Sequence, residues 1–213
     1  MKTILLIGPP ASGKGTQARL ISNKYNIPHI STSVLISNVV NDEIKEIMKQ
    51  GTLVNDDFVY QLVTNRLSQP DCERGYVLEG YPRTMTQAHD FEKLLAKLNQ
   101  KLNYVFFLDI KKEEVIKRMS GRIVCLQCEA IYNENYPAQK PKNKGICDRC
   151  GSQLQKRSDD NKTTFEKRYD VYMGMTAPII NYYQEKKQLH VIKCQDLVAD
   201  TFQEIEKIID WAC

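Results

Sequence analysis

A glycine-rich segment near the start of the chain carries a lysine at a spacing suited to binding phosphate. It reads GPPASGKGT from Gly8 to Thr16, after an apolar run at 2–7 and before a helical pattern over 14–25. In this strand-to-helix context, glycines let successive backbone N–H groups face an anion, and the start of the helix adds positive potential. We therefore predict a phosphate-binding loop in which Lys14 supplies a mobile positive charge. The alternative is a glycine-rich turn without a ligand.

Four cysteines form a second group of residues with chemical meaning. Cys125-x-x-Cys128 and Cys147-x-x-Cys150 are separated by a spacing that is typical of four-thiolate zinc sites. A tetrahedral zinc ion needs four ligands at about 2.3 Å, and two short Cys-x-x-Cys turns supply them. We predict a structural zinc ion here, with two disulfides or a redox dithiol as the alternatives. The remaining cysteines and the histidines are assigned no metal.

Arginines gather at the borders of the cysteine-bearing segment. Arg118 and Arg122 precede it, Arg157 and Arg168 follow it, and Arg83 comes directly after a predicted strand. Transfer of a phosphoryl group needs cations where negative charge builds up on the transferred oxygens, and an inserted lobe can deliver them while excluding water. The alternative is that these arginines are solvated, as surface arginines usually are.

Short apolar runs alternate with helical patterns along the chain. The strands and helices that they predict must position the phosphate-binding loop, the cysteines and the arginines. We predict five strands, at 2–7, 27–31, 76–79, 104–109 and 189–193. Strands that alternate with helices are typical of an α/β protein with helices on both faces of a parallel sheet. With the phosphate-binding loop, the pattern predicts a three-layer P-loop fold around a five-stranded parallel sheet.

Two stretches without this alternation are predicted to be inserted lobes. Residues 31–58 are polar and helical beyond the end of the second strand, and residues 121–160 hold the four paired cysteines and lack helical periodicity. The core domain would then comprise 1–30, 59–120 and 161–213. The second lobe is too short to have much core of its own, so a zinc ion would hold it together.

Composition limits the class of protein. The chain has 213 residues and a formal net charge of +4, which suits an anionic small molecule but is too weak to indicate nucleic acid or a membrane. It has no run of about 18 apolar residues, the length that a membrane-spanning helix needs. The opening MKTILLI resembles the start of a signal peptide, but Pro9 and Pro10 interrupt its apolar run. We therefore predict that it forms a buried strand and that the protein is cytoplasmic.

Further motifs give the chain a specific resemblance. They are GYPRT from Gly80 with Gln87, GRIVC from Gly121, RSDD from Arg157 and MTAP from Met175. Together with the phosphate-binding loop and the four cysteines, they make the sequence resemble an adenylate kinase of the long type, with a zinc-binding lid, over nearly its whole length. The resemblance implies a monomeric, magnesium-dependent phosphotransferase that moves the terminal phosphate of ATP to AMP and yields two ADP. The alternatives are a kinase for another nucleoside monophosphate and a nucleotide-binding regulator with weak turnover.

The resemblance also implies roles for individual residues. The ATP-binding residues would be Ala11, Ser12, Gly13, Lys14, Gly15, Thr16, Arg118, Arg122, Ile131, Tyr132 and Gln195. The AMP-binding residues would be Thr32, Leu53, Val54, Gly80, Arg83, Gln87, Arg157 and Arg168, with 31–58 as the monophosphate-binding lobe. The catalytic residues would be Lys14, Arg83, Arg122, Arg157 and Arg168. Zinc would be bound by Cys125, Cys128, Cys147 and Cys150, and Asp159 and Asp160 would hold the lid arginines.

Two positions near the expected phosphates depart from the usual patterns. Gly15 follows Lys14, so the hydroxyl that common Walker loops carry there arrives one residue later, at Thr16. Glu79 stands where the family usually has Asp beside magnesium-bound water. The carboxylate is kept, but the side chain that carries it is one methylene group longer.

The acceptor lobe departs most from the family. Where the family usually reads Ser-Thr-Gly-Asp-x-Leu-Arg, this chain reads STSVLIS from Ser31 to Ser37. Ser37 thus replaces the Arg that would grip the acceptor phosphate. Lys45 or Lys49 could replace this arginine, but the single ammonium group of a flexible lysine does not reproduce the two parallel hydrogen bonds of a guanidinium. We therefore predict weak AMP binding, with Gln87 reading the adenine through its amide donor and acceptor.

Overall fold

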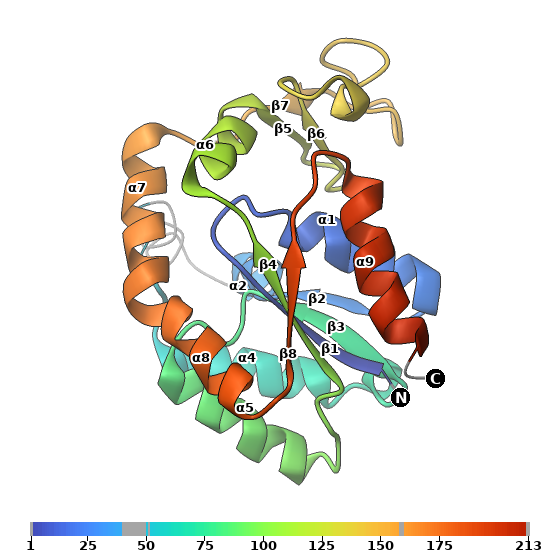
Figure 1. Cartoon of the computed structure of the whole chain (residues 1–213). Coiled ribbons are helices and arrows are strands. Elements are labelled where there is room, and N and C mark those ends of the chain that lie inside the picture. Colours follow the sequence, from blue (N-terminus) through green and yellow to red (C-terminus); the bar gives the residue numbers. More distant parts are fainter. Residues whose placement is uncertain (1, 40–49, 51, 158–159, 212–213) are drawn as a thin grey trace.

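The computed structural model describes residues 2–39, 50, 52–157 and 160–211 (Figure 1). A parallel sheet lies at its centre, with the strand order β2-β3-β1-β4-β8. The strands are β1 (Lys2–Ile7), β2 (His29–Ser31), β3 (Gly75–Glu79), β4 (Tyr104–Asp109) and β8 (Leu189–Lys193). The predicted five-stranded parallel sheet is confirmed.

The central strand, β1, is buried on both faces because it pairs in parallel with β3 on one side and β4 on the other. Side chains alternate between the two faces of a strand. Ile4 and Leu6 therefore pack into one apolar cluster, and Leu5 and Ile7 pack into the other. A strand covered on both faces is apolar throughout, which explains the unbroken run that marks β1 in the sequence.

Helices cover both faces of the sheet and complete the predicted three layers (Figure 1). On one face lie α1 (Lys14–Tyr25) and α9 (Val198–Trp211). On the other lie α4 (Asp56–Leu67), α5 (Met85–Lys97) and α8 (Ala177–Glu185), and a short 3-10 turn, η1 (Pro70–Cys72), leads from α4 toward β3. Apolar residues recur every three or four positions on the covered side, as Val59, Val63 and Leu67 do in α4. Among the described residues, no helix is long and apolar enough to cross a membrane.

Two strand boundaries differ from the predicted ones. β2 begins at His29 instead of Ile27, because Pro28 has no N–H to donate, although its carbonyl oxygen still accepts a hydrogen bond from β3. β3 begins one residue earlier than predicted, at Gly75, whose φ is 111°. A Cβ atom there would lie 2.4 Å from the carbonyl oxygen of Lys2, so only glycine fits against the neighbouring strand.

Three helical segments stand at the carboxyl edge of the sheet. α2 (Thr32–Val39) directly follows β2, and α6 (Lys112–Gly121) follows β4. α7 (Lys162–Val171) continues into α8 through a π-helical turn, η3 (Tyr172–Thr176). Pro178 lies in the first turn of α8 and has no N–H, which breaks the regular helical ladder at this point. Because ligands of open parallel sheets bind at the carboxyl edge, these segments are placed to surround one.

The segment 121–160, called the lid from here on, carries a small antiparallel sheet of its own. The strand order is β6-β5-β7, and the elements are β5 (Arg122–Cys125), β6 (Ile131–Asn133), a 3-10 turn η2 (Pro137–Gln139) and β7 (Leu154–Gln155). Its small core contains Ile123, Ala130 and Tyr132. The sequence predicted a small zinc-stapled lobe without helical periodicity, but it did not locate these strands, because strands this short show no alternation that could be recognised.

Candidate active site

A cavity of about 870 Å³ opens at the carboxyl edge of the central sheet. It is bounded by the phosphate-binding loop, α2, the segment after β3, α6, the lid and α7. Every residue that the sequence assigned to nucleotide binding lines this cavity, except Tyr132. The size and the mixed polar and apolar lining suit a cofactor-sized ligand. Residues far apart in the sequence thus surround one space.

The phosphate-binding loop owes its shape to its glycines. Gly13 has a φ of 100°, a conformation that side chains rarely allow, and α1 begins directly after it. A Cβ atom at Gly8 would lie 2.8 Å from the Oγ of Ser12 and 3.1 Å from the carbonyl oxygen of Leu108. The loop therefore folds tightly at the start of α1, whose first N–H groups have no partner within the helix. Such an arrangement suits an anion.

Lys14 lies folded back over this loop. Its Nζ donates to the carbonyl oxygens of Gly8 and Pro9, at 2.7 Å each. Its pKa is lowered to about 7, chiefly because burial disfavours the charged form. Glu79 opposes this shift, whereas three arginines add to it: Arg83, Arg168 and Arg122. A phosphate bound here would favour the ammonium form of Lys14.

Arg83 lies in a similar setting on the other side of the cavity. Its Nε donates to the carbonyl oxygen of Gly80 at 2.8 Å, and its own carbonyl oxygen accepts a hydrogen bond from Thr176 in η3 at 2.9 Å. Burial and then the nearby guanidinium of Arg168 lower the pKa of Arg83 to about 10, while Glu79 opposes the shift. Two cations that line one cavity form a site that an anionic ligand would stabilise.

Glu79 provides negative charge between these cations. Its Oε1 lies 3.3 Å from Nε2 of His29, and a Cβ atom built on Gly15 would lie 3.1 Å from the same oxygen. Burial raises the pKa of Glu79, but His29 and Lys14 outweigh burial and lower it overall. The carboxylate is therefore ionised beside the phosphate-binding loop. The sequence did not predict the contact with His29, since a histidine at the start of a strand carries no specific signal.

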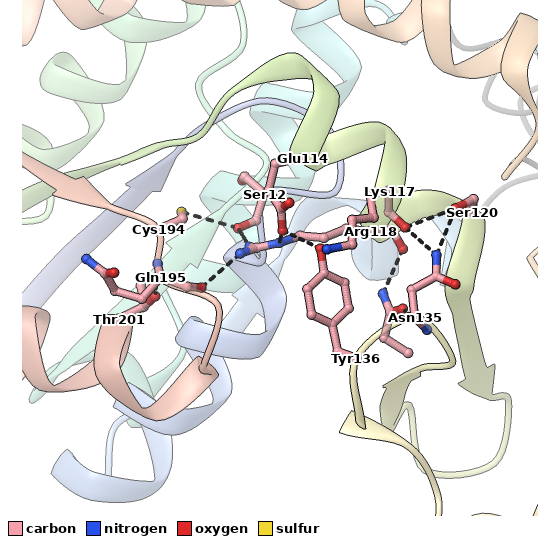
Figure 2. A network of polar contacts seen from close by, with 11 residues as sticks. Ser12, Glu114, Lys117, Arg118, Ser120, Asn135, Tyr136, Cys194, Gln195 and Thr201 are labelled. Atoms are coloured by element: carbon pink, nitrogen blue, oxygen red, sulfur yellow. Dashed lines mark hydrogen bonds and ion pairs between the residues drawn. The ribbon is translucent and has the colours of Figure 1, made fainter. Parts of the chain in front are cut away.

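Arg118 joins the phosphate-binding loop to the other end of the chain (Figure 2). Its guanidinium donates to the carbonyl oxygen of Ser12 at 3.2 Å and to that of Gln195 at 2.9 Å. Its Nε donates to Glu114 at 3.2 Å, and Glu114 also accepts a hydrogen bond from the hydroxyl of Tyr136 in the lid. The side chain that the sequence assigned to ATP is thus held in place by groups from four parts of the chain.

Two lid asparagines bond carbonyl groups near the end of α6, and Figure 2 shows one of them, Asn135. Asn133 donates from Nδ2 to the carbonyl oxygen of Arg118 at 2.7 Å, and Asn135 donates to that of Lys117 at 2.8 Å. The last four carbonyl groups of a helix lack partners within it, so Asn133 takes the place of an ordinary cap at the carbonyl oxygen of Arg118. A Cβ atom at Gly121 would lie 2.4 Å from Oδ1 of Asn133. Nothing in the sequence indicates this contact beyond two polar residues close to a glycine.

The lid also brings Arg122 and Arg157 to the cavity. Arg122 forms a two-point ion pair with Asp160, with its Nε at 2.7 Å from Oδ2. The predicted contact between Asp160 and a lid arginine is therefore present, whereas Asp159 lies outside the described residues. Such a bidentate pair fixes the plane of the guanidinium.

Gln87 is buried, yet its amide borders the cavity. Nε2 donates to Oδ1 of Asp56 at 2.6 Å, and Oε1 accepts from the backbone N–H of Arg83 at 2.7 Å. Thr84, the N-cap of α5, donates to Oδ2 of Asp56 at 2.8 Å. The sequence missed Asp56, whose position in the first turn of α4 is also common for an acidic residue without any function.

Tyr132 and Ile131 lie on different sides of the lid sheet. Ile131 borders the cavity, whereas Tyr132 is buried in the lid, where its hydroxyl accepts a hydrogen bond from the backbone N–H of Asp148 at 2.8 Å. Neighbouring residues of a strand point to opposite faces, so only one of the two can face a ligand in the cavity.

The four paired cysteines lie together at one end of the lid. Their sulfur atoms are all within 4.8 Å of one another, and the distances between Cys125 and Cys150 and between Cys128 and Cys147 are 3.4 and 3.5 Å. Tetrahedral thiolates at about 2.3 Å from a zinc ion would be about 3.8 Å apart, so the donor set fits that metal. The six cysteines that the structure describes are free thiols, which argues against the disulfide alternative.

Ser37, which replaces an arginine of the family pattern, lines the cavity from α2. Its Oγ donates to the carbonyl oxygen of Ser33 at 2.8 Å, so the hydroxyl is used within its own helix. The predicted loss of a cation at this position is thus visible in the structure. Lys45 and Lys49, the two candidates to replace that cation, lie outside the described residues.

Comparison with known proteins identifies similar sequences. The family model "Adenylate kinase" matches residues 6–188. The adenylate kinase of Caldicellulosiruptor saccharolyticus is 43% identical over 212 residues, which cover 97% of this chain and 98% of the relative. Those of Clostridium perfringens and Archaeoglobus fulgidus are each 40% identical, with 97% of both chains covered in each case.

Proposed function

Because the chain belongs to the adenylate kinase family, we propose that it transfers the terminal phosphoryl group of ATP to AMP and releases two molecules of ADP. One observation carries this proposal. Lys14 of the phosphate-binding loop lines one cavity together with Arg83, Arg122 and Arg168, which come from three other parts of the chain. Cations from several elements around one cavity are what a transferring phosphoryl group needs.

The cavity divides into a donor side and an acceptor side. On the donor side, residues 11–16 hold the phosphates of ATP, while Arg118, Arg122, Ile131 and Gln195 cover the nucleotide. On the acceptor side, the other assigned residues bind AMP: Thr32, Leu53, Val54, Gly80, Arg83, Gln87, Arg157 and Arg168. Residues 31–58 form the monophosphate-binding lobe and 121–160 form the lid, and the core domain contributes residues to both sides.

The reaction needs no nucleophilic side chain. A phosphate oxygen of AMP attacks the terminal phosphorus of ATP, and the protein contributes position and charge. Lys14, Arg83, Arg122, Arg157 and Arg168 offset the negative charge on the transferred oxygens. Adenylate kinases use magnesium with ATP, and Glu79 would hold water bound to that ion. Magnesium would supply further neutralisation of the phosphate charge.

The four cysteines would hold a structural zinc ion. Four thiolates fill a tetrahedral coordination sphere, so no position is left for water or substrate. We also propose that the protein is a cytoplasmic monomer that has no nucleic-acid or membrane partner. The modest net charge supports this part of the proposal, as do the six described cysteines, which form no disulfide with one another.

A coupled assay of ADP formation tests the function. Wild-type protein with ATP, magnesium and AMP should form ADP, and GMP, CMP and UMP should each be poorer acceptors. A chain that prefers another monophosphate would be a kinase of the same class with a different acceptor. A chain that binds ATP but forms no ADP with any of the four acceptors would contradict a phosphotransferase and favour a nucleotide-binding regulator.

A further inference from the structure

Both the nitrogen and the oxygen of the Gln87 amide have hydrogen-bond partners. We propose that Asp56, which binds the nitrogen, makes the acceptor site select 6-amino purines over 6-oxo purines. The inference rests on the proposed function, because it concerns the base of the acceptor nucleotide. Asp56 would act as a positioning residue, since its carboxylate contacts Gln87 and not the base itself. It would contribute specificity without taking part in the phosphoryl transfer.

A closed ring of hydrogen bonds surrounds the amide. Gln87 is 3% exposed, and its Nε2 donates to Oδ1 of Asp56 at 2.6 Å. Thr84 donates to Oδ2 of Asp56 at 2.8 Å and accepts from the backbone N–H of Gln87 at 3.1 Å. The backbone N–H of Arg83 completes the ring by donating to Oε1 of Gln87 at 2.7 Å. Each group in this ring has a partner of the correct kind.

The two partners of the amide fix its direction. An ionised carboxylate can only accept a hydrogen bond, and a backbone N–H can only donate one. If the amide of Gln87 were flipped, its oxygen would face the carboxylate of Asp56 and its NH2 group would face the N–H of Arg83. Both contacts would be repulsive in a buried place, so the amide keeps one orientation.

A fixed amide reads one purine edge and rejects the other. After the contacts in the ring, Nε2 keeps one hydrogen and Oε1 keeps one lone pair for a ligand. The edge of adenine offers an acceptor at ring N1 and a donor at the 6-amino group, whereas hypoxanthine offers a donor at N1 and an acceptor at the 6-oxo group. A freely turning amide could pair with either edge. The amide held by Asp56 pairs with only one order of donor and acceptor, and sites built in this way reject a mismatched base strongly.

The variant Asp56→Asn tests this inference. Asparagine has nearly the same shape but can donate as well as accept, so a flipped Gln87 amide would again find a partner. Asp57→Asn is the matched control, because it removes the same charge from the same first turn of α4 at an exposed position. The dissociation constants of AMP and IMP are measured by calorimetry for the wild type and both variants, together with turnover on each acceptor.

We expect the ratio of the IMP and AMP dissociation constants to fall about tenfold in Asp56→Asn, while the N–H of Arg83 preserves part of the preference. The ratio should not change in Asp57→Asn, and ATP binding and melting temperature should stay as in the wild type. In a Gln87→Leu background, Asp56→Asn should leave the ratio unaltered, because the amide through which it acts is gone.

Three results would overturn the inference. AMP and IMP could weaken equally in Asp56→Asn, which would show a structural role only. The ratio could change as much in Asp57→Asn, or Asp56→Asn could still change it in the Gln87→Leu background. Failure of the proposed function is a separate result: a wild type that binds AMP without transferring phosphate refutes the activity, while the binding ratio still decides the role of Asp56. A wild type that binds neither nucleotide overturns both.

Discussion

At the scale of single residues, the cavity is defined by cations that are costly to bury. Lys14 and Arg83 both have lowered pKa values, and burial is the largest cause in each case. A protein that keeps such groups charged beside one another loses stability unless an anion joins them. The cavity therefore gathers positive charge where the phosphates of two nucleotides would bind.

The lowered pKa of Lys14 predicts how ATP binding depends on pH. With a pKa of about 7, Lys14 is half protonated in the free protein at pH 7, and bound phosphate should raise that pKa. The complex then holds more protons than the free protein above pH 7, so ATP affinity should fall as pH rises from 7 toward 9. Calorimetry in buffers of different ionisation enthalpy should show proton uptake on binding at pH 8.

The control for this prediction is Lys14→Met, which should abolish the extra proton uptake. Lys24→Met changes an exposed lysine of the same helix, α1, and should leave proton uptake as it is in the wild type. Equal proton uptake by the wild type and Lys14→Met would show that another group titrates.

The missing cation on α2 gives a second prediction at this scale. Ser37→Arg should lower the KM for AMP about tenfold or more, because a charged hydrogen bond contributes about 1.5–3 kcal/mol and about 1.4 kcal/mol is a factor of ten. The KM for ATP should hardly change. Val39→Arg places the same charge on the same helix at an exposed position and serves as the control. If Ser37→Arg weakens AMP binding, another cation already occupies that place.

At the scale of elements, the lid and α6 depend on each other. The carbonyl groups of Arg118 and Lys117 in α6 are bonded by Asn133 and Asn135 from the lid, and the side chain of Arg118 reaches the phosphate-binding loop. The end of α6 therefore joins the lid to the phosphate-binding loop (Figure 2).

Asn133→Ala tests this connection. The variant leaves the carbonyl oxygen of Arg118 without its side-chain partner, so we expect the free energy of unfolding to fall by about 1–3 kcal/mol. The KM for ATP should rise, since Arg118 loses part of its support. Urea denaturation and steady-state kinetics measure the two effects. Asn143→Ala, at an exposed lid position, should change neither quantity. Equal behaviour of the two variants would argue against a structural link at α6.

The thiolate cluster predicts that the lid depends on metal. Purified protein should contain one zinc ion per chain, and Cys147→Ser should remove it and lower the melting temperature. The free energy of unfolding should fall by several kcal/mol, a fraction of the roughly 10–16 kcal/mol with which zinc stabilises an isolated zinc finger. Cys194→Ser changes a thiol outside the cluster and should keep the zinc content. Protein without stoichiometric zinc, or an unchanged melting temperature in Cys147→Ser, would refute the site.

At the scale of the whole molecule, local patterns predicted the central sheet but not the contacts across it. β1, β4 and β8 begin and end at the predicted residues because their apolar runs and flanking turns are local features. The partners of Gln87 and Arg118 could not be predicted, because they join segments far apart in the sequence. The opposite directions of Ile131 and Tyr132 required knowledge of β6, which is too short to recognise.

The fold explains why one chain can position two nucleotides. The parallel sheet places the phosphate-binding loop and the segment with Arg83 at adjacent strand ends, since β1 and β3 are neighbours. The lid and α2 follow other strands at the same edge, so their side chains meet in one cavity. Donor and acceptor groups that are bound side by side react with little further loss of freedom.

Transfer of label from γ-labelled ATP tests the central claim most directly. With magnesium and AMP, the label should appear in ADP, with two ADP formed for each ATP consumed. Lys14→Met should slow this transfer on the order of a thousandfold, because a cation that meets the transferring phosphoryl group is lost. If the label appears only in inorganic phosphate, or if ATP is consumed at the same rate without AMP, the chain is not the phosphotransferase that its site and its family indicate.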